Sequence, residues 1–80
     1  MKTIPNSFNF ETSDLNLAAF LKANKIPLVS TRRQQNKVFF GFNHPDIQSI
    51  AMQYFNNGKV SASSYARALS ELKTLIFQGT

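Results

Sequence analysis

The sequence predicts an α+β fold in a single small domain. A three-stranded sheet is expected to carry helices on one face, with elements in the order β-α-β-β-α-α. Three observations support this prediction. Two strand-like runs joined by a turn occupy residues 28–42. A helix-like segment precedes them, and two amphipathic segments follow. The chain has 80 residues, 42% of them hydrophobic and eight of them Phe, which is enough for one domain with a core.

The first strand and the first helix are predicted within residues 8–24. Residues 8–10 (Phe-Asn-Phe) alternate at period two, which is typical of a short strand. Residues 12–14 (Thr-Ser-Asp) provide a cap and an acidic first turn for a helix that runs to about Asn24. This helix has so little polar surface that we expect neighbours on more than one side. Pro27 separates it from the next strand.

The two central strands form a predicted hairpin. In its second strand, one set of alternating residues is apolar and is expected to face the helices: Val38, Phe40 and Phe42. Phe39 therefore points to the opposite face. The register of the preceding strand stays open, because a shift by one residue exchanges its two faces. Either Arg32 or Arg33 can accompany Phe39.

Two helices close the chain. Pro45 and Asp46 mark the start of the first, and its apolar stripe is Ile47, Ile50, Ala51 and Tyr54. Gly58 suits the left-handed residue that ends a helix. Ser61 is the expected N-cap of the last helix, whose stripe is Tyr65, Leu69, Leu72 and Ile76. We expect residues 1–7 to form a loose arm, residues 8–77 the domain, and residues 78–80 a C-terminal tail.

The turn of the hairpin provides the main functional signal. The chain has nine Lys or Arg and four Asp or Glu, a net charge of +5. Arg32, Arg33 and Lys37 lie within six positions, beside Phe39. Single-stranded nucleic acid is held by cations that track phosphates and by aromatic faces that stack bases. We therefore predict a nucleic-acid-binding site in which the three cations contact phosphates and Phe39 stacks.

Catalytic chemistry finds little support in the sequence. The four carboxylates, Glu11, Asp14, Asp46 and Glu71, form no evident acid/base pair. His44 is the only imidazole, and it has no clustered partners that would complete a metal site. The three glycines are isolated, so no phosphate loop or dinucleotide motif occurs. We predict a binding module that is not an enzyme and has no catalytic residue, metal or cofactor.

A second class of function remains open at this point. A sheet with helices on one face leaves an open face and two edges, which favour strand addition or dimerisation. The alternative prediction is thus a protein adaptor or inhibitor, as a homodimer or bound to an acidic protein surface. With no cysteine, no secretory leader and no apolar run of about 20 residues, we expect a cytoplasmic location and no membrane partner.

Two segments resemble a family of small bacterial and phage-borne domains of unknown function: Phe10-x-Thr12-Ser13-Asp14-Leu15-x-Leu17-Ala18-Ala19-Phe20-Leu21 and Gly58-Lys-Val60-x-x-x-x-Tyr65-x-x-Ala68-Leu69-x-Glu71-Leu72-Lys73. The resemblance covers roughly residues 8–76. It implies a common fold and a phage or mobile-element setting, and it supplies no catalytic residues. Taken together with the basic hairpin, it makes a nucleic-acid-binding or regulatory accessory protein our favoured prediction. The chain departs from the pattern at His44, where the family leads one to expect Ser or Asp before the helix-starting proline.

Overall fold

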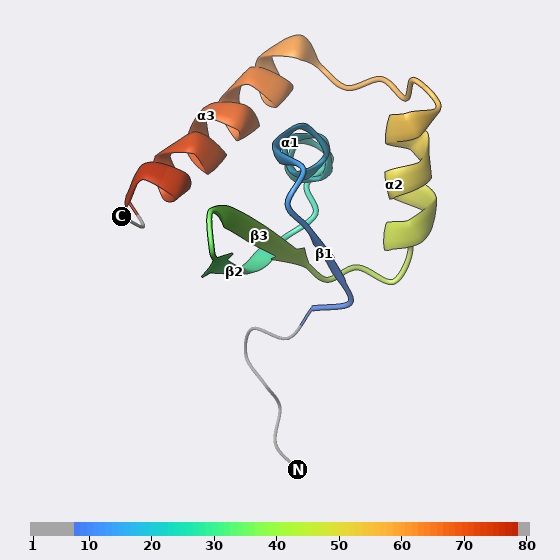
Figure 1. Ribbon diagram of the computed structural model, residues 1–80. Coiled ribbons are helices and arrows are strands. Elements are labelled where there is room, and N and C mark those ends of the chain that lie inside the picture. The colour runs from blue at the N-terminus through green and yellow to red at the C-terminus, as the bar shows by residue number, and fades with distance from the viewer. Residues whose placement is uncertain (1–7, 79–80) are drawn as a thin grey trace.

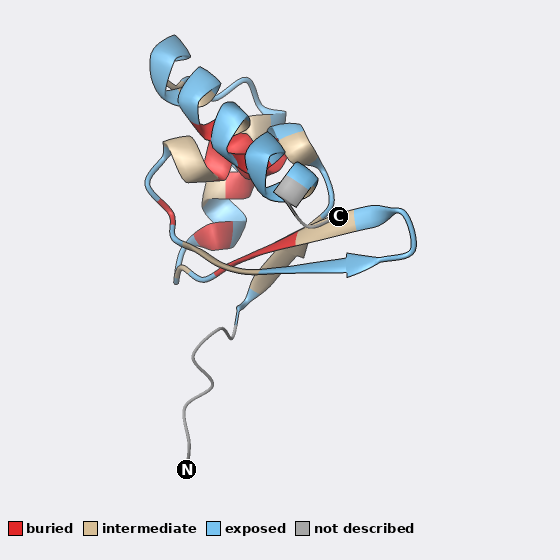
Figure 2. Ribbon diagram, turned by 90° about the vertical axis from the view of Figure 1, so that its left-hand side faces the viewer, coloured by how far each residue is buried: buried red, intermediate tan, exposed pale blue. Residues whose placement is uncertain are grey.

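The computed structural model describes residues 8–78 and confirms the predicted element order. The elements are β1 (Phe10–Thr12), α1 (Leu15–Ala23), β2 (Leu28–Gln34), β3 (Lys37–Phe42), α2 (Ile47–Phe55) and α3 (Ala62–Gln78). The predicted N-terminal arm and the last two residues of the predicted tail lie outside the described part. The three helices lie on one side of the sheet, as expected for this α+β fold (Figures 1 and 2).

The sheet is antiparallel, with β3 in the centre and β1 and β2 at the edges. Phe42 lies opposite both Phe10 and Leu28, so one end of the sheet is apolar on its helix side. The pairing of β2 with β3 shifts between Leu28 and Ser30, which marks a β-bulge. Beyond this bulge the register is regular to the turn.

The first strand begins two residues later than predicted. The regular alternation of residues 8–10 does not hold, because the backbone N–H of Asn9 donates to the Phe42 carbonyl while its side-chain amide donates to the His44 carbonyl, at 3.1 and 2.9 Å. The Phe8 ring approaches Gly41, on the face away from the helices. Asn9 thus links the segment before β1 to the end of β3 and the residues after it, and the regular strand pairing begins at Phe10.

Helix α1 is the centre of the core. In Figure 1 it lies between α2 and α3, above the sheet. Five consecutive residues, Leu17–Leu21, are buried, which confirms that this helix is covered on several sides. The largest fully buried side chains come from four positions in three elements: Phe40, Phe42, Leu21 and Leu72. Both predicted stripes on α2 and α3 pack against this core.

The starts of α1 and α3 follow the predicted capping chemistry, whereas Asp46 at the start of α2 makes no side-chain capping hydrogen bond. Asp14 caps α1, since its Oδ1 accepts from the backbone N–H groups of residues 16 and 17 at 3.0 and 3.1 Å. Ser61 caps α3 by accepting from the N–H of Ser64 at 3.3 Å. The prediction for Gly58 is wrong: the left-handed residue after α2 is Asn57, with φ of 64°. Asn tolerates this conformation better than most residues with a side chain, so the turn is completed one position earlier.

Candidate nucleic-acid interface

The open face of the sheet is defined by the register of the hairpin. Arg32 lies opposite Phe39, so the alternative that the sequence left open is settled in favour of Arg32. Gly41 lies opposite both Glu11 and Ser30 on the two edge strands. Because side chains alternate along strands, these residues share the face that points away from the helices. We call this surface, made of Glu11, Ser30, Arg32, Phe39 and Gly41, the open face.

The guanidinium group of Arg32 is fixed in place on the open face. Its Nε and Nη2 donate to the two carboxylate oxygens of Glu11, at 2.7 and 3.0 Å. Its Nη1 donates to Oε1 of Gln34 at 2.6 Å. The hydrogen bonds to Glu11 raise the pKa of Arg32 above its ordinary value. Bidentate pairing sets the orientation of the guanidinium plane as well as its position.

Arg32 also covers the aromatic ring on this face. Its Cζ lies 4.4 Å from the centroid of Phe39, a cation–π contact. The side chain of Arg32 keeps 48% of its surface exposed, whereas that of Glu11 keeps 17%. Phe39 and Arg32 therefore form a two-layer stack, in which the guanidinium is the more accessible layer. Arginine planes stack bases as aromatic rings do, so this stack is chemically suited to a nucleobase.

The structure does not gather all the predicted site residues on one surface. Arg33 lies opposite Val38 and faces the helix side, where its Nη2 donates to the Ile76 carbonyl of α3 at 2.8 Å. It thereby links the hairpin to the last turns of α3. Lys37 begins β3, opposite Gln34, and is exposed. Of the predicted residues, Arg32, Phe39 and Lys37 thus belong to the open-face side of the hairpin.

The side chains considered for catalysis have structural roles in the described part of the chain. Asp14 caps α1, and Glu11 pairs with Arg32. His44 is half-buried, and its Nδ1 accepts from the backbone N–H of Asp46 at 3.0 Å. Within residues 8–78, no group of three or more His, Cys, Asp or Glu side chains could hold a metal ion. No described helix is long and apolar enough to cross a bilayer.

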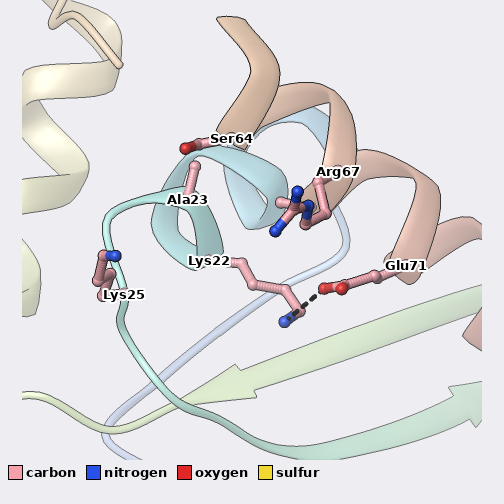
Figure 3. A pocket seen from close by; sticks show the side chains of 7 residues that line it. Lys22, Ala23, Lys25, Ser64, Arg67 and Glu71 are labelled. Carbon is pink, nitrogen blue, oxygen red and sulfur yellow. Dashed lines mark ion pairs between the residues drawn. The ribbon is translucent and has the colours of Figure 1, made fainter. Parts of the chain in front are cut away.

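A second charged site joins residues that the sequence shows as scattered. Lys22, Lys25, Arg67 and Glu71 line a shallow cleft between α1 and α3 (Figure 3). Nζ of Lys22 lies 2.9 Å from Oε1 of Glu71. The sequence carried a partial signal, since Lys22 and Lys25 are three residues apart and Arg67 and Glu71 four apart. The packing of α1 on α3, which brings the two pairs together, is not encoded in those spacings.

Comparison with known proteins identifies the family of this chain. Residues 7–78 match the model of a domain of unknown function, DUF5659, and the chain therefore belongs to that family. This match confirms the resemblance to an uncharacterised domain family that the two sequence segments indicated. No similarity to a curated protein or to a solved structure is significant.

Proposed function

We propose that this member of the DUF5659 family binds single-stranded nucleic acid through the open face of its sheet, as a module without catalytic activity. The observation that carries the proposal is the stack of Arg32 on Phe39, held by Glu11. A base that stacks on the guanidinium meets a surface that is already oriented. Little conformational freedom of Arg32 then remains to be lost on binding.

The charge balance of the chain supports the same proposal. A net charge of +5 attracts polyanions before any specific contact forms. Glu11 neutralises the charge of Arg32. Within this site we therefore expect Arg32 to contribute its flat guanidinium surface for stacking rather than a charge for phosphate. Lys37 is exposed at the start of β3, and we expect it to contact the phosphate beside a stacked base. Arg33 is assigned to the attachment of α3, because it donates to Ile76 on the other side of the sheet.

A salt titration tests the proposal. A labelled single-stranded oligonucleotide of random sequence is titrated with the protein at several salt concentrations, and binding is followed by fluorescence anisotropy. We expect affinity to fall as salt rises, because bound phosphates release counterions. Lys37→Gln should reduce the slope of log K against log salt by about 0.7, the value for one contact on a single strand.

The matched control is Lys59→Gln, which removes the same charge from the connection between α2 and α3. That connection lies on the helix side of the molecule, away from the sheet (Figure 1). The control should keep the wild-type slope. Absence of binding by the wild-type protein at low salt would refute the proposal, and so would an equal loss of slope in the two variants.

A protein partner is the second candidate, favoured by a different observation. Phe8, beside Gly41 on the open face, is 41% exposed, and within residues 8–78 the strand β2 pairs only with β3. An aromatic surface next to an unpaired strand edge favours a second copy of the chain or an acidic protein surface. Self-association that survives high salt, measured by analytical ultracentrifugation, would support this candidate. A regulatory role in a phage or mobile element, and a cytoplasmic location, remain predictions from the sequence.

A further inference from the structure

We propose that the cleft between α1 and α3 is a binding site for a small phosphate monoester or inorganic phosphate dianion. The site is separate from the open face and does not depend on the proposed function. Its polar lining consists of Lys22 and Lys25 from the end of α1 and its connection, and Ser64, Arg67 and Glu71 from α3. Three cationic side chains and one carboxylate leave an excess of two positive charges, which a dianion balances.

The hydrogen-bond donors of this cleft are largely unused within the described structure. The Lys25 ammonium, the Arg67 guanidinium and the Ser64 hydroxyl make no hydrogen bond or ion pair with any of residues 8–78. Lys22 uses one of its three N–H donors for Glu71. In Figure 3 the Lys22 side chain extends to Glu71 with Arg67 nearby on α3, and Lys25 stands on the connection that follows α1; all four residues line the one cleft. Like charges held around one hollow favour an anion between them.

The local backbone does not oppose an anion strongly. The C-terminal end of α1 is the negative end of its dipole, which by itself would repel phosphate. However, the carbonyls of Phe20, Leu21 and Lys22 accept hydrogen bonds from the backbone N–H groups of the next residues, Asn24–Ile26. Ser64 lies in the first turn of α3, at the positive end of that helix dipole. The dipole of α1 therefore disfavours an anion in the cleft and the dipole of α3 favours one. Because these two effects oppose each other, the charges of the side chains determine whether an anion binds.

The charge excess also predicts which phosphate is preferred. A phosphate monoester carries close to two negative charges above its second pKa of about 6. A phosphodiester, such as each link of a nucleic-acid backbone, carries one. A cleft with two excess positive charges should therefore select methyl phosphate over dimethyl phosphate. This selectivity distinguishes the cleft from the open face, where bases and diesters are the proposed ligands.

The test is a titration of the full chain with inorganic phosphate, methyl phosphate and dimethyl phosphate, followed by amide chemical shifts at constant ionic strength. We expect saturable shifts centred on residues 22–25 and 64–71 for the two dianions, and weaker or no saturation for dimethyl phosphate. Arg67→Gln should weaken methyl phosphate binding about tenfold, because a hydrogen bond to a charged group is lost. Lys73→Gln removes the same charge from α3 outside the cleft and should change affinity less than about twofold.

Glu71→Gln provides a variant with the opposite sign. It removes the carboxylate that occupies Lys22 and should tighten methyl phosphate binding, whereas a variant that merely disturbs the fold would weaken it. Shifts that rise linearly with all three ligands would overturn the proposal and leave an adventitious ion only. Equal effects of Arg67→Gln and Lys73→Gln would overturn it too, because they would indicate diffuse charge rather than a site.

Discussion

Arg32 and Glu11 form a bidentate ion pair that spans the central strand of the sheet. The two residues belong to the edge strands β2 and β1, and Nε and Oε2 are 2.7 Å apart. Glu11 lies opposite Gly41 and Arg32 lies opposite Phe39, so the pair runs diagonally across β3 on the open face. The ion pair thus ties the two edge strands together on the open face, and the guanidinium lies over the Phe39 ring.

Gly41→Ala should disturb the packing of the Phe8 and Ser30 side chains on the open face. A Cβ atom at position 41 would lie 2.9 Å from Cδ2 of Phe8 and closer still to Oγ of Ser30, so a neighbour must move. We expect a loss of about 1–3 kcal/mol in the free energy of unfolding, as for other overpacked sites. Chemical denaturation measures it. Ser30→Ala in the same chain should recover part of the loss, and an unchanged stability of the single variant would contradict the packing described.

Leu72→Ala should show how much the closing helix contributes to the core. Leu72 is fully buried on α3, and deletion of a buried leucine side chain costs about 2–5 kcal/mol. In a domain of this size such a loss approaches the whole stability. Leu75→Ala, on the same helix but at a side chain 38% exposed, is the matched control and should cost clearly less. Thermal unfolding followed by circular dichroism compares the two, and equal melting temperatures would mean that α3 does not pack as described.

The ion pair between Lys22 and Glu71 predicts a pH dependence with a defined sign. The hydrogen bond and charge of Lys22 lower the pKa of Glu71 below its ordinary value of 4.5. The ionised form is thus favoured in the folded state, so the pair stabilises the fold above pH 4.5 and loses this contribution as the pH falls through the lowered pKa. Both side chains are partly exposed, at 31% and 51%, so the effect is small.

Unfolding of the wild type and of Glu71→Gln should therefore differ near neutral pH and converge in acid. The free energies of unfolding from urea titrations between about pH 7 and about pH 2.5 cover the window. In a Lys22→Gln background the same substitution should have a smaller pH-dependent effect, since the main partner is gone and only the weaker charge interaction of Glu71 with Arg67 remains. A difference between wild type and Glu71→Gln that persists at the acid end would show that Glu71 acts through something other than its charge.

Much of this fold follows from local patterns in the sequence. Asp14 and Ser61 cap helices through side-chain oxygens, and alternation along β3 correctly separated Phe40 from Phe39. These features depend on residues near one another in the chain. The wrong prediction at Gly58 also concerns neighbouring residues. The left-handed conformation occurs one position earlier, at Asn57.

The arrangement of the candidate sites could not be predicted in the same way. The choice between Arg32 and Arg33 depended on register, and register is set by pairing across the sheet. The partner of Arg32 is Glu11, 21 positions away, and the partner of Arg33 is a backbone carbonyl 43 positions away. Contacts between residues so far apart in the sequence leave no helical or strand periodicity from which they could be predicted. The three cations looked like one cluster because they are close in sequence, whereas strand alternation places Arg32 and Arg33 on opposite faces.

The most direct test of the account is the substitution Arg32→Lys, measured by oligonucleotide titration at several salt concentrations. Lysine keeps the positive charge but has no plane to lie on Phe39 and cannot make the bidentate contact with Glu11. We predict that affinity falls by roughly fivefold to a hundredfold, the range for loss of one stacked base, while the salt slope stays at its wild-type value. Lys37→Arg keeps the positive charge, which is all that the proposed phosphate contact requires. It should leave both the affinity and the salt slope unchanged. Wild-type affinity in a folded Arg32→Lys protein would contradict the account, because charge alone would then suffice at position 32.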